Sequence, residues 1–117
     1  MTPPATPSHY RPAFAAGRLV GTRCDLCGYA TAPPTPRCPA CGGITSGESF
    51  EPQGIVWAST VVHIPVGRRE PPFGLAYVDV NEGPRILAHL ADAALLPVGT
   101  SVTLVKVDGE VVARTAE

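Results

Sequence analysis

The second half of the chain is a succession of short segments rich in β-branched and aromatic residues, with polar and turn residues between them. Runs of this kind are typical of strands. They predict strands over residues 54–63, 73–80, 85–90, 99–107 and 110–114. Turn residues separate them, most clearly Asn81-Glu-Gly-Pro84 and Asp108-Gly109, and a short helix or loop is expected over residues 91–97. This order favours a small closed five-stranded barrel of the OB type.

The first of these predicted strands is long enough to bend as it crosses from one side of the barrel to the other. Strict alternation would give it two faces with different neighbours. One face is expected to carry Val56, Ala58, Thr60 and Val62, and the other Ile55, Trp57, Ser59 and Val61.

The first half of the chain is punctuated by prolines and glycines. Residues 1–17 are expected to form a Pro-rich lead and one short helix over residues 10–18, which has alanines in its middle and a glycine near its end. Tyr10 and Phe14 would share a face of that helix, either packed on their own domain or docked on a partner subunit. Strands are predicted over residues 18–23 and 29–32. The prolines of residues 33–36 form a stiff connector, and residues 44–51 return to the first sheet or cross to the barrel.

Four cysteines stand at metal-ligand spacing between these strands. Cys24 and Cys27 form one Cys-x-x-Cys pair, Cys38 and Cys41 form another, and ten residues separate the pairs. Four thiolates so arranged can converge on one tetrahedral ion, and a glycine directly after each pair suits the tight turn of a metal knuckle. The sequence therefore predicts a structural zinc ribbon over residues 18–51, followed by the barrel over residues 52–117. Four thiolates leave the metal no open position for substrate, so no catalytic role is expected for it.

Disulfide bonds and redox chemistry are the two alternatives to zinc for these cysteines. Disulfides need an oxidising compartment, whereas the first residues, Met1-Thr-Pro-Pro-Ala-Thr-Pro-Ser, lack the apolar core of a secretory signal. A redox Cys-x-x-Cys is expected once, near a βαβ pattern, rather than twice among strands. We therefore expect a cytoplasmic protein.

Composition narrows the classes of partner. The 117 residues suffice for one domain or two very small modules, and 44% of them are apolar. Nine Lys plus Arg against ten Asp plus Glu give a formal charge of −1, with Lys106 as the single lysine. No apolar run approaches the roughly 20 residues of a membrane span. Neither a membrane nor a polyanion is an expected partner.

These motifs together resemble a known family over nearly the whole chain. The features that carry the resemblance are Cys24-x-x-Cys27-Gly, the Pro-Pro connector into Cys38-Pro-x-Cys41, the strand Gly54-Ile-Val-Trp-Ala-Ser-Thr-Val and a barrel strand opening near Gly99-Thr-Ser-Val. They are similar to those of the zinc-ribbon plus OB-fold family, long labelled a domain of unknown function. Its members accompany thiolase-superfamily enzymes of acyl-CoA metabolism. The implied fold is mainly β: a short N-terminal helix, a rubredoxin-like zinc ribbon and an OB barrel.

The resemblance implies a non-catalytic accessory subunit, or a domain of a longer protein, that docks a thiolase-fold enzyme dimer in a heterotetramer. The partner would be a thiolase, an acyltransferase or synthase, or an aldolase that cleaves CoA thioesters of steroid side chains in lipid catabolism. In such assemblies the barrel helps shape the passage for the acyl-CoA, and the catalytic Cys and His belong to the other chain. No catalytic residue is therefore assigned here.

Contacts with CoA are the least constrained by sequence. Arg68 and Arg69 form the one paired basic site and suit a phosphate; the alternative, which the sequence favours, is a solvated loop beside Glu70. Trp57 is a candidate to stack on adenine, or a core residue. His63 and His89 are interpreted as packed or surface residues. Asp79 is expected on a wet barrel face or at an interface.

Two competing functions were considered. Zinc ribbons and OB barrels also hold single-stranded nucleic acids, but that needs rows of basic residues, and eight arginines are scattered along this chain. A free-standing thioesterase or hydratase would need a pocket for the thioester, for which this small chain leaves little wall.

Overall fold

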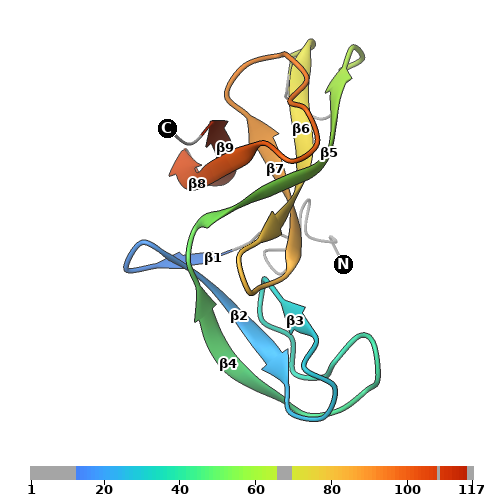
Figure 1. Ribbon diagram of the computed structural model, residues 1–117, viewed down its shortest axis with the longest axis vertical. Coiled ribbons are helices and arrows are strands. Elements are labelled where there is room, and N and C mark those ends of the chain that lie inside the picture. The colour runs from blue at the N-terminus through green and yellow to red at the C-terminus, as the bar shows by residue number, and fades with distance from the viewer. Residues whose placement is uncertain (1–12, 66–69, 108, 116–117) are drawn as a thin grey trace, which may run out of the picture.

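The structure is a computed structural model that describes residues 13–65, 70–107 and 109–115. All regular elements in this part of the chain are strands, arranged in a small sheet and a closed barrel. Figure 1 shows the barrel above the small sheet, with the chain passing from one to the other between β4 and β5. The described residues contain no helix able to cross a membrane.

The small sheet is built around β2 (Arg18–Cys24). Along one edge it pairs with β4 (Thr45–Phe50), from Leu19 opposite Phe50 to Cys24 opposite Thr45. Along its other edge it pairs first with β1 (Ala13–Ala15) and then with β3 (Ala30–Thr31). The buried residues of β2 are Leu19 and Gly21 in its first half and Thr22 and Cys24 in its second half, so the buried side changes between Gly21 and Thr22. The sheet thus carries Cys24 at the end of its central strand.

The predicted N-terminal helix is wrong in the part that the structure describes. Residues 13–15 form β1, which turns back onto β2 through Ala16 and Gly17, at φ 52° and 76°. Two consecutive residues in the left-handed region make a tight hairpin turn whose twist suits an antiparallel pair. Pairing with β2 and the packing of Phe14 against the core outweigh the helix propensity of the alanines. Residues 10–12 of the predicted helix lie outside the described residues.

The barrel confirms the predicted OB-type architecture. Its strands are β5 (Gln53–Val62), β6 (Phe73–Val80), β7 (Arg85–Leu90), β8 (Ser101–Val107) and β9 (Glu110–Thr115). Their order around the barrel is β5-β6-β7-β9-β8, with β5 pairing β8 to close it. The β7–β9 pair is parallel, and the other barrel pairs are antiparallel. Residues 91–97 form a loop.

A β-bulge at Trp57 bends the long first strand of the barrel. The pairing of β5 with β6 slips between Val56 and Ala58, so that the register skips Trp57. The alternation expected over residues 55–62 therefore holds through Ile55, Val56 and Trp57 but not beyond, where Ala58 and Ser59 are both half-buried. A bulge inserts one residue and reverses the faces that follow it. The strand therefore bends as predicted, next to Val56, whose backbone is also hydrogen-bonded to Gly99 and Thr100.

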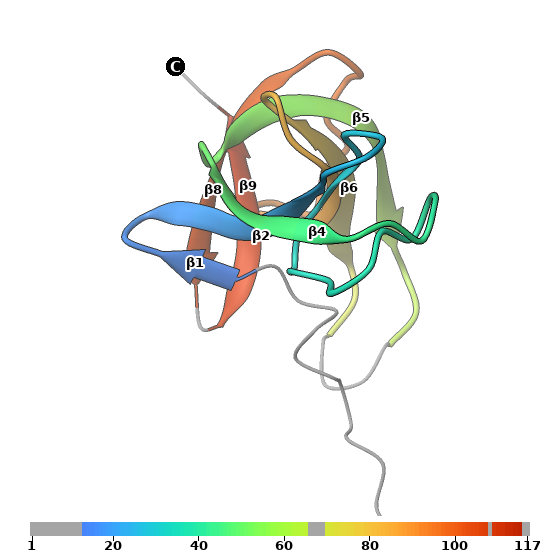
Figure 2. The ribbon, with the colours of Figure 1, turned by 90° about the horizontal axis from the view of Figure 1, so that it is seen from below.

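Sheet and barrel share one hydrophobic core. Leu19 of β2 and Phe50 of β4 belong to the same buried cluster as the inward-facing barrel residues, which are Val56, Ala76, Val78, Val80, Ile86, Ala88, Val102, Leu104, Val111 and Ala113. The Phe50 ring lies so close to Gly21 and Gly83 that a methyl group on either glycine would come within 3.0 Å of it. Figure 2 shows the small sheet lying across one end of the barrel. The two parts are therefore packed as one body.

Candidate metal centre and the surface beside it

The four cysteines meet at the far end of the small sheet. Cys24 and Cys38 are buried, whereas Cys27 and Cys41 are exposed, and all four sulfurs lie within 4.8 Å of one another. The Cys24 and Cys41 sulfurs are 3.5 Å apart, and those of Cys27 and Cys38 are 3.6 Å apart. Zinc–sulfur bonds of about 2.3 Å in a tetrahedron separate sulfurs by about 3.8 Å. The spacing of these donors therefore fits one zinc ion.

Each cysteine pair sits in a knuckle whose backbone is shaped for thiolate. The amides of Leu26 and Cys27 donate to the Cys24 sulfur at 3.4 Å, and the amide of Ala40 donates to the Cys38 sulfur at 3.3 Å. Each knuckle closes with a glycine amide bonded to the carbonyl of its first cysteine, where Gly28 and Gly42 adopt φ 79° and 78°. Glycine adopts this left-handed conformation without steric strain, because it has no Cβ atom.

Backbone amides and neighbouring thiols shift the pKa values of the cysteines in opposite directions. The N–H groups of Cys27 and Leu26 help to lower the pKa of Cys24 to about 6, because they stabilise its thiolate. The Gly43 amide acts to lower the pKa of Cys41 as well, but the neighbouring thiols of Cys24 and Cys27 raise it to about 12. Four sulfurs so close cannot all be anionic without a cation between them. A bound divalent ion supplies that charge, so the chemistry of the donor set also fits zinc, and the zinc is structural.

Arg23 ties the first knuckle to the barrel. Its guanidinium donates to the carbonyl of Gly28 at 2.9 Å, to the Glu48 carboxylate at 2.8 Å, and to the carbonyl of Glu82 in the β6–β7 turn at 2.6 Å. The same group lies over the Phe50 ring, 5.8 Å from its centroid. Hydrogen bonding to Arg23 lowers the pKa of Glu48. One side chain thus joins the knuckle, β4 and the β6–β7 turn.

A second charged pair lies on the outer face of the barrel. Arg85 donates to both oxygens of Asp79, at 2.6 Å and 3.2 Å, and its guanidinium lies 3.9 Å from the centroid of the Trp57 ring. Tyr77 meets that ring edge-on, with centroids 5.9 Å apart. Trp57 is therefore an exposed residue held by its neighbours and is not part of the core.

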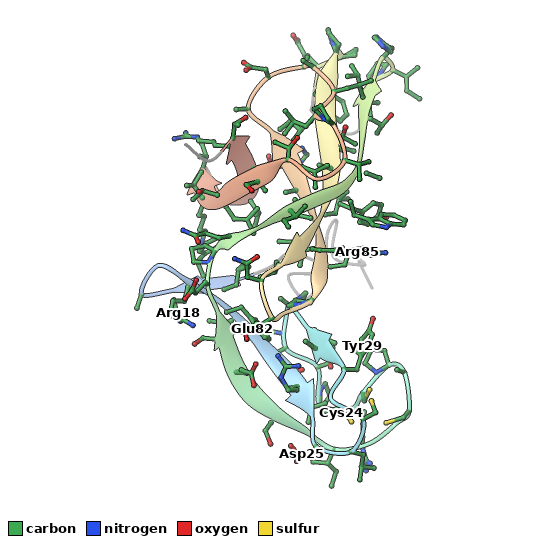
Figure 3. All side chains as sticks on the ribbon, in the orientation of Figure 1. Arg18, Cys24, Asp25, Tyr29, Glu82 and Arg85 are labelled. Carbon is green, nitrogen blue, oxygen red and sulfur yellow. The ribbon has the colours of Figure 1, made fainter. Side chains whose placement is uncertain are left out.

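A cleft of about 760 Å³ separates this face from the first knuckle. Tyr29 lines it on the zinc-ribbon side and Arg85 on the barrel side. Figure 3 shows these two side chains on the same side of the molecule, with the cysteines below them. The cleft is the place where the two parts of the fold present side chains to a common space.

The other candidates from the sequence are distributed differently. Phe14 is half-buried against the chain's own core, and its predicted contact with a partner stays a prediction. Tyr10, Arg68 and Arg69 lie outside the described residues. The His89 ring lies 3.5 Å from the Glu110 carboxylate, and its centroid is 6.4 Å from that of the tilted Phe73 ring. The structure therefore brings the four zinc ligands together. Trp57 lies instead among residues that the sequence does not predict to be its neighbours.

Comparison with known proteins places this arrangement in a family. Residues 13–44 match the family profile described as the rubredoxin-like zinc ribbon domain of ChsH2, and residues 49–115 match its C-terminal OB-fold domain. The chain belongs to the ChsH2 family. The resemblance drawn from the knuckles and the Gly54 strand is thereby confirmed, and the structural zinc is a property of this family's ribbon.

Two curated relatives are described as DUF35 domain-containing scaffold proteins. The one from Pyrococcus furiosus is 37% identical over 87 residues, which are 72% of this chain and 61% of the relative. The one from Methanocaldococcus jannaschii is 31% identical over 78 residues, 63% of this chain and 55% of the relative. The matched regions thus span less than two thirds of those relatives.

A solved structure of the same family gives the fold match. A chain of the complex described as Ltp2-ChsH2(DUF35) aldolase superposes on this one with a TM-score of 0.68 at 28% identity. The match covers 92% of this chain and 100% of that chain. A family member of this size and shape is thus found in an aldolase assembly.

The sequence alone does not connect Arg23, Asp79 and Arg85 with their partners. A signal for the last two was present, because the turn at Asn81-Glu-Gly-Pro84 sets residues 79 and 85 opposite each other on paired strands. Arg23 gave only a weak signal, its place directly before Cys24. Its role depends on how the barrel packs on the small sheet, which spacing along the chain does not reveal.

Proposed function

We propose that this chain is a non-catalytic accessory subunit that docks a thiolase-like enzyme and forms part of its acyl-CoA channel. The observation that carries the proposal is the match over the full length of a chain in an aldolase complex, together with the scaffold description of the relatives. The proposed reaction of the complex is C–C bond cleavage or formation on a CoA thioester, in lipid or steroid side-chain catabolism in the cytoplasm.

The chemistry of the chain supports a division of labour. All four of its cysteines belong to the metal set, so a cysteine nucleophile for a thioester has to come from the partner. Zinc holds the ribbon, and the ribbon and the barrel are packed as one body around Leu19 and Phe50. Docking of this body on a partner dimer, one copy on each subunit, would set the barrel against the mouth of the partner's acyl-CoA tunnel. Arg68 and Arg69 are the residues proposed to contact CoA phosphates.

The proposal is tested by an activity assay on the thiolase-like enzyme encoded nearest to this chain. The partner is assayed alone and with the zinc-loaded chain, on a panel of acyl-CoA and hydroxyacyl-CoA substrates. We expect kcat/KM to rise at least about tenfold in the presence of the chain, because a completed channel holds the thioester in reacting position. A panel on which the partner is equally active without the chain would contradict the proposal.

Binding of single-stranded nucleic acid is the second candidate, favoured by the exposed rings of Trp57 and Tyr77 on an OB barrel. The charges oppose it, because Arg85 beside those rings is already paired with Asp79. The two functions are separated by titrating the zinc-loaded chain with a fluorescent single-stranded oligonucleotide at 0.1 M salt. Binding at concentrations within about tenfold of those used for the partner would favour nucleic acid, and no binding in that range would favour the accessory subunit.

A further inference from the structure

Four exposed apolar side chains form a row across the outer face of the barrel. They are Ile55 and Trp57 on β5, Tyr77 on β6 and Leu87 on β7. Tyr77 lies directly opposite Leu87 on one side and opposite Ala58, next to Trp57, on the other. Between 46% and 48% of each of these four side chains is exposed. We call this row, with Asp79 and Arg85 beside it, the β5–β7 face.

The β5–β7 face is held rigid before anything binds it. The Arg85 guanidinium covers one side of the Trp57 ring and is itself fixed by two hydrogen bonds to Asp79. The edge-on contact with Tyr77 holds the ring from another direction. Aromatic side chains with few free rotamers lose little entropy when they are covered. Trp, Tyr and Arg are also the residue types that dominate the energetic centres of protein interfaces.

The charges of the β5–β7 face favour a protein over a polyanion. OB barrels commonly bind their ligands on the face of the second and third strands, here β6 and β7. Oligonucleotides need unpaired cations along such a face. Arg85 lies beside this row, and its charge is balanced by Asp79 at 2.6 Å. A neutral, apolar and aromatic surface matches the apolar centre of a protein interface, whose rim is polar.

The size of the row is consistent with such a centre. Four side chains of this type, each about half exposed, present roughly 350 Å² of mainly apolar surface. A stable complex buries about 800 Å² on each partner, so the row would supply nearly half of that area. The cleft of about 760 Å³ between Arg85 and Tyr29 adjoins the row and offers a place for a partner side chain. Tyr29, half of it exposed, extends the aromatic surface onto the zinc ribbon.

We propose that the β5–β7 face, centred on Tyr77 and Leu87, is the surface on which the partner enzyme subunit docks. This inference rests on the proposed function and adds to it the part of the chain that makes the contact. Trp57 then contacts protein, in place of the adenine contact that its sequence position suggests. The ribbon reaches the same partner through Tyr29 and the edge of the cleft.

The test is the affinity of zinc-loaded Leu87→Glu for the purified thiolase-like partner. A buried, unpaired carboxylate at the centre of an interface is strongly unfavourable, so we expect the Kd to rise at least about 30-fold. The matched control is Leu95→Glu, which places the same charge on another exposed leucine, in the β7–β8 loop outside the row. Its Kd should stay within about threefold of the wild-type value. Tyr77→Glu is the second variant, with the expected loss of Leu87→Glu.

Folding is checked by zinc content and melting temperature, which all three exposed substitutions should leave close to wild type. Leu87→Glu and Tyr77→Glu variants that fold and still bind the partner within threefold would overturn the inference and leave the proposed function standing. A wild-type chain that does not bind the partner would remove both. The inference also falls if the wild-type chain forms a dimer that Leu87→Glu dissociates. Tight oligonucleotide binding that Leu87→Glu abolishes would have the same consequence.

Discussion

Replacing Cys38 by Ser is expected to abolish zinc binding and to unfold the ribbon. Cys38 is buried, and its sulfur belongs to a set of four that only a cation can hold together. A serine hydroxyl is a poor zinc ligand, and three thiolates do not complete the tetrahedron. Binding of structural zinc contributes on the order of 10 kcal/mol to the folding of such modules. Zinc quantification and circular dichroism of the purified variant measure the loss.

The effect should reach the partner as well as the metal. Both knuckles share one zinc, so its loss also unfolds the first knuckle. Arg23 donates hydrogen bonds to the carbonyl of Gly28 in that knuckle and to the carbonyl of Glu82 in the β6–β7 turn, so the turn beside Arg85 loses a support. We therefore expect Cys38→Ser to lose partner binding too. The control is wild-type protein stripped with a chelator, in which added zinc should restore both properties. A Cys38→Ser chain that binds the partner at wild-type affinity without metal would exclude the ribbon from docking.

Replacing Phe50 by Ala should be the most destabilising change outside the zinc ligands. Its ring is 3% exposed and packs between Gly21 of β2 and Gly83 of the β6–β7 turn, where the small sheet meets the barrel. Emptying such a site costs about 3–5 kcal/mol, since glycines on both sides have no side chain with which to fill it. Urea unfolding of the zinc-loaded chain, followed by circular dichroism and by the fluorescence of Trp57, measures it.

The comparison variant for Phe50→Ala is Phe14→Ala. Phe14 is half-buried at the edge of the same core, so its removal should cost about 1–2 kcal/mol. Phe50→Ala should in addition separate the two unfolding signals, because ribbon and barrel lose their shared packing. If both variants unfold with a single transition at the same urea concentration, the shared core does not carry the coupling assigned to it.

The barrel could be predicted because each of its strands is recognisable from its own short stretch of sequence. The segments 73–80 and 85–90 are short apolar runs bounded by turn residues, and the structure places β6 and β7 over those residues. The zinc ribbon was predictable for the same reason, since the two Cys-x-x-Cys-Gly motifs carry their own geometry. In both cases the signal lies within a short stretch of chain.

The sequence predicts the structure wrongly where tertiary contacts outweigh local preference. Alanine favours a helix over Ala13–Ala15, but the turn at Ala16 and Gly17 and the pairing with β2 make this segment a strand. The bulge at Trp57 has no local signature, and it decides which side chains of β5 face solvent. The same holds for the Asp79–Arg85–Trp57 stack, whose members come from three strands. Such sites depend on register and on closure of the barrel.

We propose that this chain is a zinc-containing subunit of a thiolase-like complex. The most direct test of this proposal is co-expression with the thiolase-like protein encoded nearest to it, followed by size-exclusion chromatography with zinc quantification. We expect co-elution as a stable complex, a heterotetramer of two chains of each kind, with one zinc per copy of this chain. Separate elution of this chain, with no shared peak at micromolar concentrations, would contradict it.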